Sequence, residues 1–244
     1  MTRGRDMGPA TSCTSAELQK DRLQMHRLHR ARNIAELRPF VPAVGIQETR
    51  MTLKADGKRV AILATNGFEE SELFSPKGAI EAAGGSVEVI SLEAGDIQGL
   101  RHMEKGRTIH VDKTLAEARA DDYDAILIPG GLFSPDKLRT EKEALRFASS
   151  FVNQRKPVFA ICHGPQVLIS AGAAKDRRMT GVKSIQKDLA NAGADVSDEA
   201  VVVDDGLVTS RTPDDLDAFN AKIVEEMTET KHDRHQKHFG FAFF

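Results

Sequence analysis

Two cysteines, Cys13 and Cys162, are the only thiols in this chain of 244 residues. Two thiols cannot build a disulfide framework or a zinc site with several cysteine ligands. Tryptophan is absent and aromatic residues make up 5% of the chain, but the hydrophobic fraction of 40% is sufficient for a folded core. Because cysteine is so scarce, we expect a reducing, cytoplasmic location.

The chain also has no long apolar run and no large excess of charge. A membrane-spanning helix needs about 18 consecutive apolar residues, so we expect no association with a membrane. Lysine and arginine total 34 against 36 for aspartate and glutamate, which leaves a net charge of −2. Such a balance does not attract polyanions, and we expect no stable complex with nucleic acid.

Composition predicts three regions. We expect residues 1–57 to be an N-terminal extension, disordered or partly helical over residues 18–37, and an arginine-rich transit sequence is a weaker alternative because acidic residues interrupt it. Residues 58–228 are expected to form the folded domain. Residues 229–244 are expected to be a C-terminal tail, where three histidines are a weak metal-binding alternative to a solvated segment. We expect no metal and no cofactor in the working protein.

Strand and helix patterns alternate from residue 58 onward. Short apolar runs predict buried strands over 59–64, 123–128 and 157–161. Helical spacing, with glycines at the end of the first helix, predicts helices over 69–83, 140–154, 185–192 and 214–227, and another that begins at 165. Further strands are predicted over 86–92, 200–203 and 207–210, together with a hairpin over 99–113 that turns at Gly106.

Repeated strand–helix units imply an α/β sandwich with a mostly parallel sheet and helices on both faces. Thr140 and Glu143 have the spacing of a capping box at the start of one helix. Ligands of such sheets bind beyond the carboxyl ends of the strands. This rule directs attention to three loops, at 65–72, 129–135 and 162–165.

Cys162 stands where an apolar strand ends and a helix begins, in Phe159-Ala160-Ile161-Cys162-His163-Gly164-Pro165. A lone cysteine after apolar residues is by default a small buried side chain. A sharp strand-to-helix turn, however, projects its residue above the sheet, as in the nucleophile elbow of hydrolases. The N-terminus of the following helix would lower the pKa of the thiol. We therefore interpret Cys162 as a nucleophile.

Polar groups in the other loops are candidates to assist Cys162. His163 follows it directly and is either a general base or the source of a backbone N–H for an oxyanion. Gly130 and Gly131 would also expose N–H groups, although a turn that needs positive φ explains glycines equally well. Glu69 and Glu72 share one helix face, and a carboxyl beside a thiolate would hold a proton. Their simpler role is to interact with the helix dipole.

These residues resemble the PfpI branch of the ThiJ/PfpI superfamily over roughly residues 58–227. The motifs that carry the resemblance are Asn66-x-Phe68-Glu69-x-x-Glu72, Leu127-x-Pro129-Gly130-Gly131, Ala160-x-Cys162-His163-Gly164-Pro165 and Ser210-Arg211-x-Pro213-x-Asp215-Leu216. The resemblance implies a flavodoxin-like three-layer sandwich related to the class I glutamine amidotransferases. Glutaminase chemistry itself is not expected, because no His-x-Glu follows Cys162.

The resemblance also implies roles for single residues. Cys162 would be the nucleophile, Glu72 its hydrogen-bonded neighbour and Glu69 a second acid, while the N–H groups of Gly131 and His163 would bind an oxyanion. Asp136 occupies the place of an acid that orients the histidine from a neighbouring subunit, although some members have the longer glutamate there. Val182 stands where some members have an active-site tyrosine, so a step assisted by tyrosine is not expected.

For function, the resemblance implies a stress-response enzyme that acts as a glyoxalase or deglycase on methylglyoxal, glyoxal and their protein or nucleotide adducts. The alternatives are an intracellular cysteine peptidase of the PfpI type and, in a different class, a redox sensor or holdase chaperone that uses the same cysteine. The resemblance further implies a homodimer or larger homo-oligomer.

Overall fold

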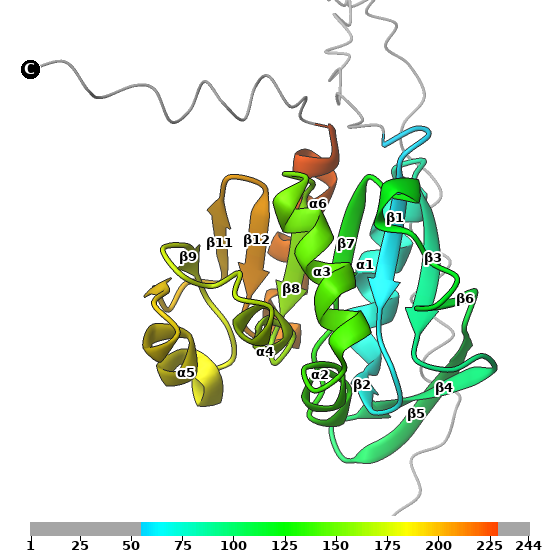
Figure 1. The fold of residues 1–244 in the computed structure, drawn as a ribbon, viewed down its shortest axis with the longest axis horizontal. Helices are drawn as coiled ribbons and strands as arrows, with labels where there is room; N and C mark the ends of the chain where they lie inside the picture. The colour runs from blue at the N-terminus through cyan, green and yellow to red at the C-terminus, as the bar shows by residue number, and fades with distance from the viewer. Residues whose placement is uncertain (1–54, 229–244) are drawn as a thin grey trace, which may run out of the picture. The chain divides into compact units, whose positions relative to one another are not determined.

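The structure is a computed structural model, and it describes residues 55–228 (Figure 1). Most of the expected N-terminal extension, including the helix over 18–37, and the histidines of the expected tail lie outside these residues.

A seven-stranded sheet forms the centre of the fold, in the order β11-β12-β8-β7-β1-β3-β6. Its strands are β1 (Arg59–Leu63), β3 (Ser86–Ser91), β6 (Lys113–Thr114), β7 (Ala125–Ile128), β8 (Val158–Ile161), β11 (Val201–Asp204) and β12 (Leu207–Ser210). All neighbours are parallel except β11, which returns antiparallel to β12. Asp205 and Gly206 both have positive φ in the turn between them, as a tight two-residue hairpin requires.

Helices cover both faces of this sheet. In Figure 1, α3 (Lys142–Asn153) and α4 (Pro165–Ser170) lie in front of it, and α1 (Glu70–Ala82) and α6 (Leu216–Thr228) lie behind. The shorter helices are α2 (Phe133–Leu138), α5 (Gln186–Asn191), η1 (Ala120–Asp122), η2 (Lys183–Ile185) and η3 (Pro213–Asp215). The predicted α/β sandwich with a mostly parallel sheet is confirmed.

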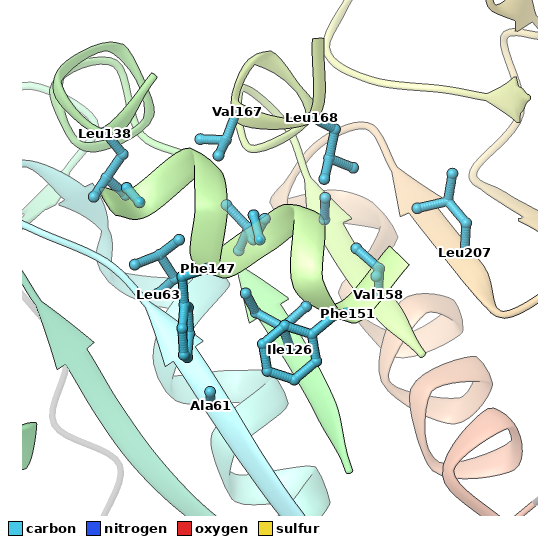
Figure 2. Close-up of a cluster of buried hydrophobic side chains, with 14 of the residues drawn as sticks. Ala61, Leu63, Ile126, Leu138, Phe147, Phe151, Val158, Val167, Leu168 and Leu207 are labelled. Atoms are coloured by element: carbon cyan, nitrogen blue, oxygen red, sulfur yellow. The ribbon is translucent and has the colours of Figure 1, made fainter. Parts of the chain in front are cut away.

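The continuous apolar runs serve two cores at once. Alternate residues of a strand point to opposite faces, so Leu63 and Ile126 pack beneath Phe147 and Phe151 of α3 (Figure 2). Ile62 and Leu127, one position earlier or later, belong to the second core, on the side of α1 and α6. A strand buried on both faces therefore shows no alternation in its sequence.

Two small sheets flank the main one. β2 (Phe68–Glu69), β4 (Asp96–Arg101) and β5 (Glu104–His110) form the first, and β9 (Arg178–Met179) and β10 (Asp195–Val196) form the second. The predicted hairpin is present as β4 and β5, but its predicted turn at Gly106 is wrong. The chain turns at His102 and Met103, with φ of +57° at His102. Gly106 lies inside β5, and a Cβ at this position would overlap the Glu70 carboxylate, which favours glycine there.

The predicted capping box at Thr140 is also wrong. The Thr140 hydroxyl donates to the Lys137 carbonyl at 2.8 Å, so it closes the turn after α2 and is not available to α3. Helix α3 begins at Lys142, after Glu141, and has no side-chain cap.

Candidate active site

Cys162 forms a strained elbow between β8 and α4. Its φ is +59°, in the left-handed region that costs a non-glycine residue about 1–3 kcal/mol. Hydrogen bonds on both sides hold it there: the Cys162 N–H donates to Ser210 O at 3.0 Å, and the Gly164 N–H donates to Ile161 O at 2.8 Å. The expected turn at the strand end is therefore present, with Pro165 at the start of α4.

Two glycines make room for this elbow. A Cβ at Gly164 would overlap the carbonyl oxygen of Ile128, at the end of the neighbouring strand. A Cβ at Gly130 would lie 2.7 Å from the Cβ of Cys162 and would also collide with Glu72. Glycine at these positions is thus explained by close approach of β7, β8 and α1.

Glu72 on α1 is completely buried beside Cys162. Its Oε2 accepts the Gly130 N–H at 2.9 Å. Its Oε1 is also buried and has no hydrogen-bond partner of normal geometry within residues 55–228. Burial, with a contribution from the charge of Glu69, raises the pKa of Glu72 to about 8. The carboxyl therefore holds a proton at neutral pH, which it can offer to the sulfur.

The Cys162 thiol does not have the lowered pKa predicted from the helix terminus. Burial raises its pKa, and an ionised Glu72 would raise it further. The backbone N–H groups of Gly131 and His163 act in the opposite direction because they stabilise the thiolate. Helix α4 has only six residues, and desolvation outweighs its dipole. A protonated Glu72 then favours the thiolate, because its O–H can donate a hydrogen bond to the sulfur. An ionised Glu72 would instead repel the negative charge of the thiolate.

The His163 ring lies against the sulfur. Its Nδ1 is 3.3 Å from Cys162 Sγ, and its Nε2 is 3.3 Å from the Ser184 hydroxyl on η2. The ring is half-buried, and this burial lowers the pKa of His163. A neutral imidazole beside a thiol is the arrangement expected of a general base.

Glu69 is buried at the end of β2, where its N–H donates to Gly130 O at 3.2 Å. Its Oε2 accepts the His102 N–H at 3.0 Å, and it lines a pocket of about 620 Å³ between α1 and the β4–β5 hairpin. Glu70 does not join the site: it accepts from the backbone N–H and the side chain of Arg107. Glu69 therefore acts on the buried Glu72 through its charge and also lines an open pocket.

Asp136 is not brought to His163 within one chain. It is exposed on α2 and lines a separate pocket of about 460 Å³, near Asn66 and Glu93. The role that the resemblance implies for it needs a second subunit and stays a prediction.

The Ser210-to-Leu216 motif supports the elbow, and its Pro213 lines the pocket beside Glu69. Ser210 accepts the Cys162 N–H, and Arg211 holds both oxygens of Asp215 at 3.0 and 3.1 Å. A two-pronged pair of this kind fixes geometry as well as charge. The end of β12 is thereby tied to the start of α6.

Ser184 is the site residue that sequence reasoning missed. It is exposed, lies 21 positions after His163 and belongs to a short 3-10 turn. No local pattern marks such a serine, because its role comes from the ring that the fold brings beside it.

Within residues 55–228, no group of three or more His, Cys, Asp or Glu side chains is arranged to hold a metal ion. The same residues contain no helix with the length and hydropathy to cross a membrane.

Comparison with known proteins places this geometry in a family. The model of the DJ-1/PfpI family matches residues 58–226. The chain belongs to the DJ-1/PfpI family. Among its relatives, YraA of Bacillus subtilis (strain 168), which is named as a candidate cysteine protease, is 53% identical over 167 residues, covering 68% of this chain and 96% of that protein. An uncharacterized protein of Staphylococcus aureus (strain Mu50) is 51% identical over 172 residues, covering 70% and 98%.

Solved structures of DJ-1/PfpI proteins share the fold. A two-domain protein from Anabaena variabilis, with DJ-1/ThiJ/PfpI-like and ferritin-like domains, is 40% identical with a TM-score of 0.66, over 70% of this chain and 48% of that one. Drosophila melanogaster DJ-1beta is 27% identical with a TM-score of 0.65, over 74% and 94%. The predicted superfamily and its flavodoxin-like fold are confirmed.

Proposed function

We propose that this DJ-1/PfpI protein is a cofactor-independent cysteine enzyme that acts as a glyoxalase or deglycase on methylglyoxal, glyoxal and their amine adducts. The observation that carries the proposal is Glu72, which is completely buried with a proton to donate beside Cys162. Such a carboxyl stabilises a thiolate without bringing a negative charge to it. The proposed setting is a cytoplasmic homo-oligomer under aldehyde stress.

In the proposed reaction, His163 Nδ1 takes the proton of Cys162 and the sulfur adds to the aldehyde carbon. The alkoxide that forms is held by the N–H groups of Gly131 and His163, the same groups that stabilise the thiolate. A proton then moves from the former aldehyde carbon to its neighbour, which converts the hemithioacetal of methylglyoxal into a lactoyl thioester. Water hydrolyses the thioester to lactate and restores the thiol. On a hemiaminal adduct the sulfur displaces the amine from the same carbon, so a C–S bond forms as the C–N bond breaks. The amine leaves with the proton that His163 took from the thiol, and the same hemithioacetal results.

The confined surroundings of Cys162 favour a small electrophile. The sulfur is largely buried among Glu72, Gly130 and the His163 ring. A three-carbon oxoaldehyde needs only the sulfur and two N–H donors, whereas a polypeptide needs an extended groove.

A peptidase of the PfpI type is the second candidate. It is favoured by the 53% identity to YraA, which is named as a candidate cysteine protease, and by the short distance from Cys162 to His163. The redox-sensor alternative rests on the same Cys162–Glu72 pair and predicts a stable sulfinate without turnover.

One set of assays separates these functions. We would measure methylglyoxal consumption, amine release from purified adducts free of methylglyoxal, and casein cleavage, for the wild type, Cys162→Ala and the matched thiol variant Cys13→Ala. We expect aldehyde turnover to fall at least about a hundredfold in Cys162→Ala and to be unchanged in Cys13→Ala.

Other outcomes would decide against the proposal. Turnover retained by Cys162→Ala would remove Cys162 as nucleophile. Casein cleavage alone, lost in Cys162→Ala, would establish the peptidase. Sulfinate on Cys162 after peroxide treatment, found by mass spectrometry without any turnover, would establish the sensor.

A further inference from the structure

The contact between His163 and Ser184 gives the imidazole a partner within its own chain. The Ser184 Oγ lies 3.3 Å from Nε2, on the side of the ring opposite the sulfur. A histidine that works as a base needs one ring nitrogen free and the other held by a hydrogen bond. Ser184 is placed to supply that second contact.

The turn that carries Ser184 is attached to the elbow itself. The Val182 N–H donates to the carbonyl of Cys162 at 3.1 Å, and Ile185 is buried in the core below. On the other side, the Gln186 amide donates to Gly181 O at 3.2 Å. The first bond holds the backbone of the turn beside the elbow, and the second closes the turn around Ser184.

We propose that Ser184 is a positioning residue, which accepts a hydrogen bond from the Nε2–H of His163 and so leaves Nδ1 unprotonated toward Cys162. The hydroxyl favours one tautomer of the ring and one orientation of it. In the opposite arrangement, the hydroxyl would donate to Nε2 and the ring could not take the proton of the thiol.

The proton count is consistent with this role. When Nδ1 takes the proton of Cys162, the imidazolium keeps its Nε2–H donated to Ser184. The Cys162 thiolate and the His163 imidazolium together carry no net charge. The ring returns the proton to the product oxygen or to the leaving amine. Because a hydroxyl is neutral, it does not stabilise the imidazolium as a carboxylate would, and the ring remains a base of lowered pKa.

The surroundings of the ring support an uncharged partner. The groups beside it are Cys162 and Ser184, and Glu72 lies beyond the sulfur. Burial is the cause of the lowered His163 pKa, and no charged side chain of residues 55–228 contributes to it. An acid from a second subunit could still join, since the Ser184 hydroxyl keeps its own proton to donate.

This inference rests on the proposed function for its kinetic consequence, but its structural part can be measured without substrate. Nitrogen-15 NMR of the imidazoles reports the tautomer of His163, and His163→Asn identifies its signal. The variants are Ser184→Ala, which removes the hydroxyl, Ser184→Thr, which keeps it, and Lys187→Ala as a control at an exposed position of α5.

We expect the wild type, Ser184→Thr and Lys187→Ala to show Nδ1 of His163 unprotonated, and Ser184→Ala to show a mixture of tautomers. The kcat of Ser184→Ala for methylglyoxal should fall about three- to tenfold, the effect of losing one neutral hydrogen bond, with KM unchanged and with recovery in Ser184→Thr. A wild-type tautomer in Ser184→Ala, or protonated Nδ1 in the wild type, would overturn the inference. If Ser184→Ala shows the tautomer mixture but the wild type does not turn over aldehyde, the proposed function is refuted and the inference about Ser184 stands.

Discussion

At the scale of the residue, the site depends on which of two buried groups holds a proton. Glu72 and Cys162 are both desolvated, which disfavours charge on either. Residue types predicted that a carboxyl beside the thiolate would hold a proton, the family resemblance pointed to Glu72, and the raised pKa of Glu72 agrees with both. The expected lowering of the thiol pKa was wrong, because the degree of burial cannot be read from a strand-end motif.

Burial of Glu72 makes the stability of the fold depend on pH. Its pKa is about 8 in the folded protein and near 4.5 when unfolded, so between these values the unfolded chain releases a proton that the folded chain keeps. The free energy of unfolding should therefore fall as pH rises from 4.5 to 8, by up to about 5 kcal/mol at 1.36 kcal/mol per unit. Glu72→Gln, which stays neutral, should lose this dependence and gain stability over the wild type at pH 8.

Urea unfolding at pH 5 and pH 8 measures this difference. Glu93→Gln is the matched control, because Glu93 is an exposed carboxylate, and it should follow the wild type. If Glu72→Gln kept the wild-type change between the two pH values, Glu72 would not be the group that holds the proton.

At the scale of the element, short apolar or alternating runs predicted every strand of the main sheet except β6, and helical spacing predicted its long helices. The errors fall on elements that are short or defined by distant partners. β2 has two residues and exists because it pairs with β4, about 30 positions away. Helix α2 follows the glycine loop with six residues, too few for a periodic pattern. A glycine at position 106 suggested a turn, but the residue lies in a strand beside the Glu70 side chain of α1, which a Cβ would overlap.

Two glycine substitutions test how the elements approach one another. Gly164→Ala would place its Cβ against Ile128 O, which is backbone and cannot move aside, so we expect a loss of about 1–3 kcal/mol in unfolding free energy, the usual cost of overpacking. Gly78→Ala, in α1 with open space around its Cβ, should instead gain up to about 1 kcal/mol from helix propensity. Thermal and urea unfolding of both variants would reveal the difference, and equal effects would contradict the packing described for the elbow.

At the scale of the whole molecule, the described chain contains the nucleophile, its proton-bearing neighbour, the N–H donors and a partner for His163. Asp136 is the predicted residue that remains apart. Its position on the exposed side of α2 is compatible with a role in trans, where one subunit completes the site of another. Symmetric oligomers bring the same residue to each partner's site in this way.

Mixing two inactive variants tests whether Asp136 acts between subunits. Cys162→Ala lacks the nucleophile and Asp136→Ala lacks the acid, so in a mixed dimer one site receives both residues from different chains. If Asp136 acts in trans, subunits unfolded and refolded together should recover about a quarter of wild-type turnover, because half of the dimers are mixed and each has one complete site. The variants refolded separately and combined without exchange are the control. No recovery, with confirmed mixed dimers in native mass spectrometry, would show that Asp136 does not act on His163 of a partner subunit, and would leave Ser184 as the group that positions His163.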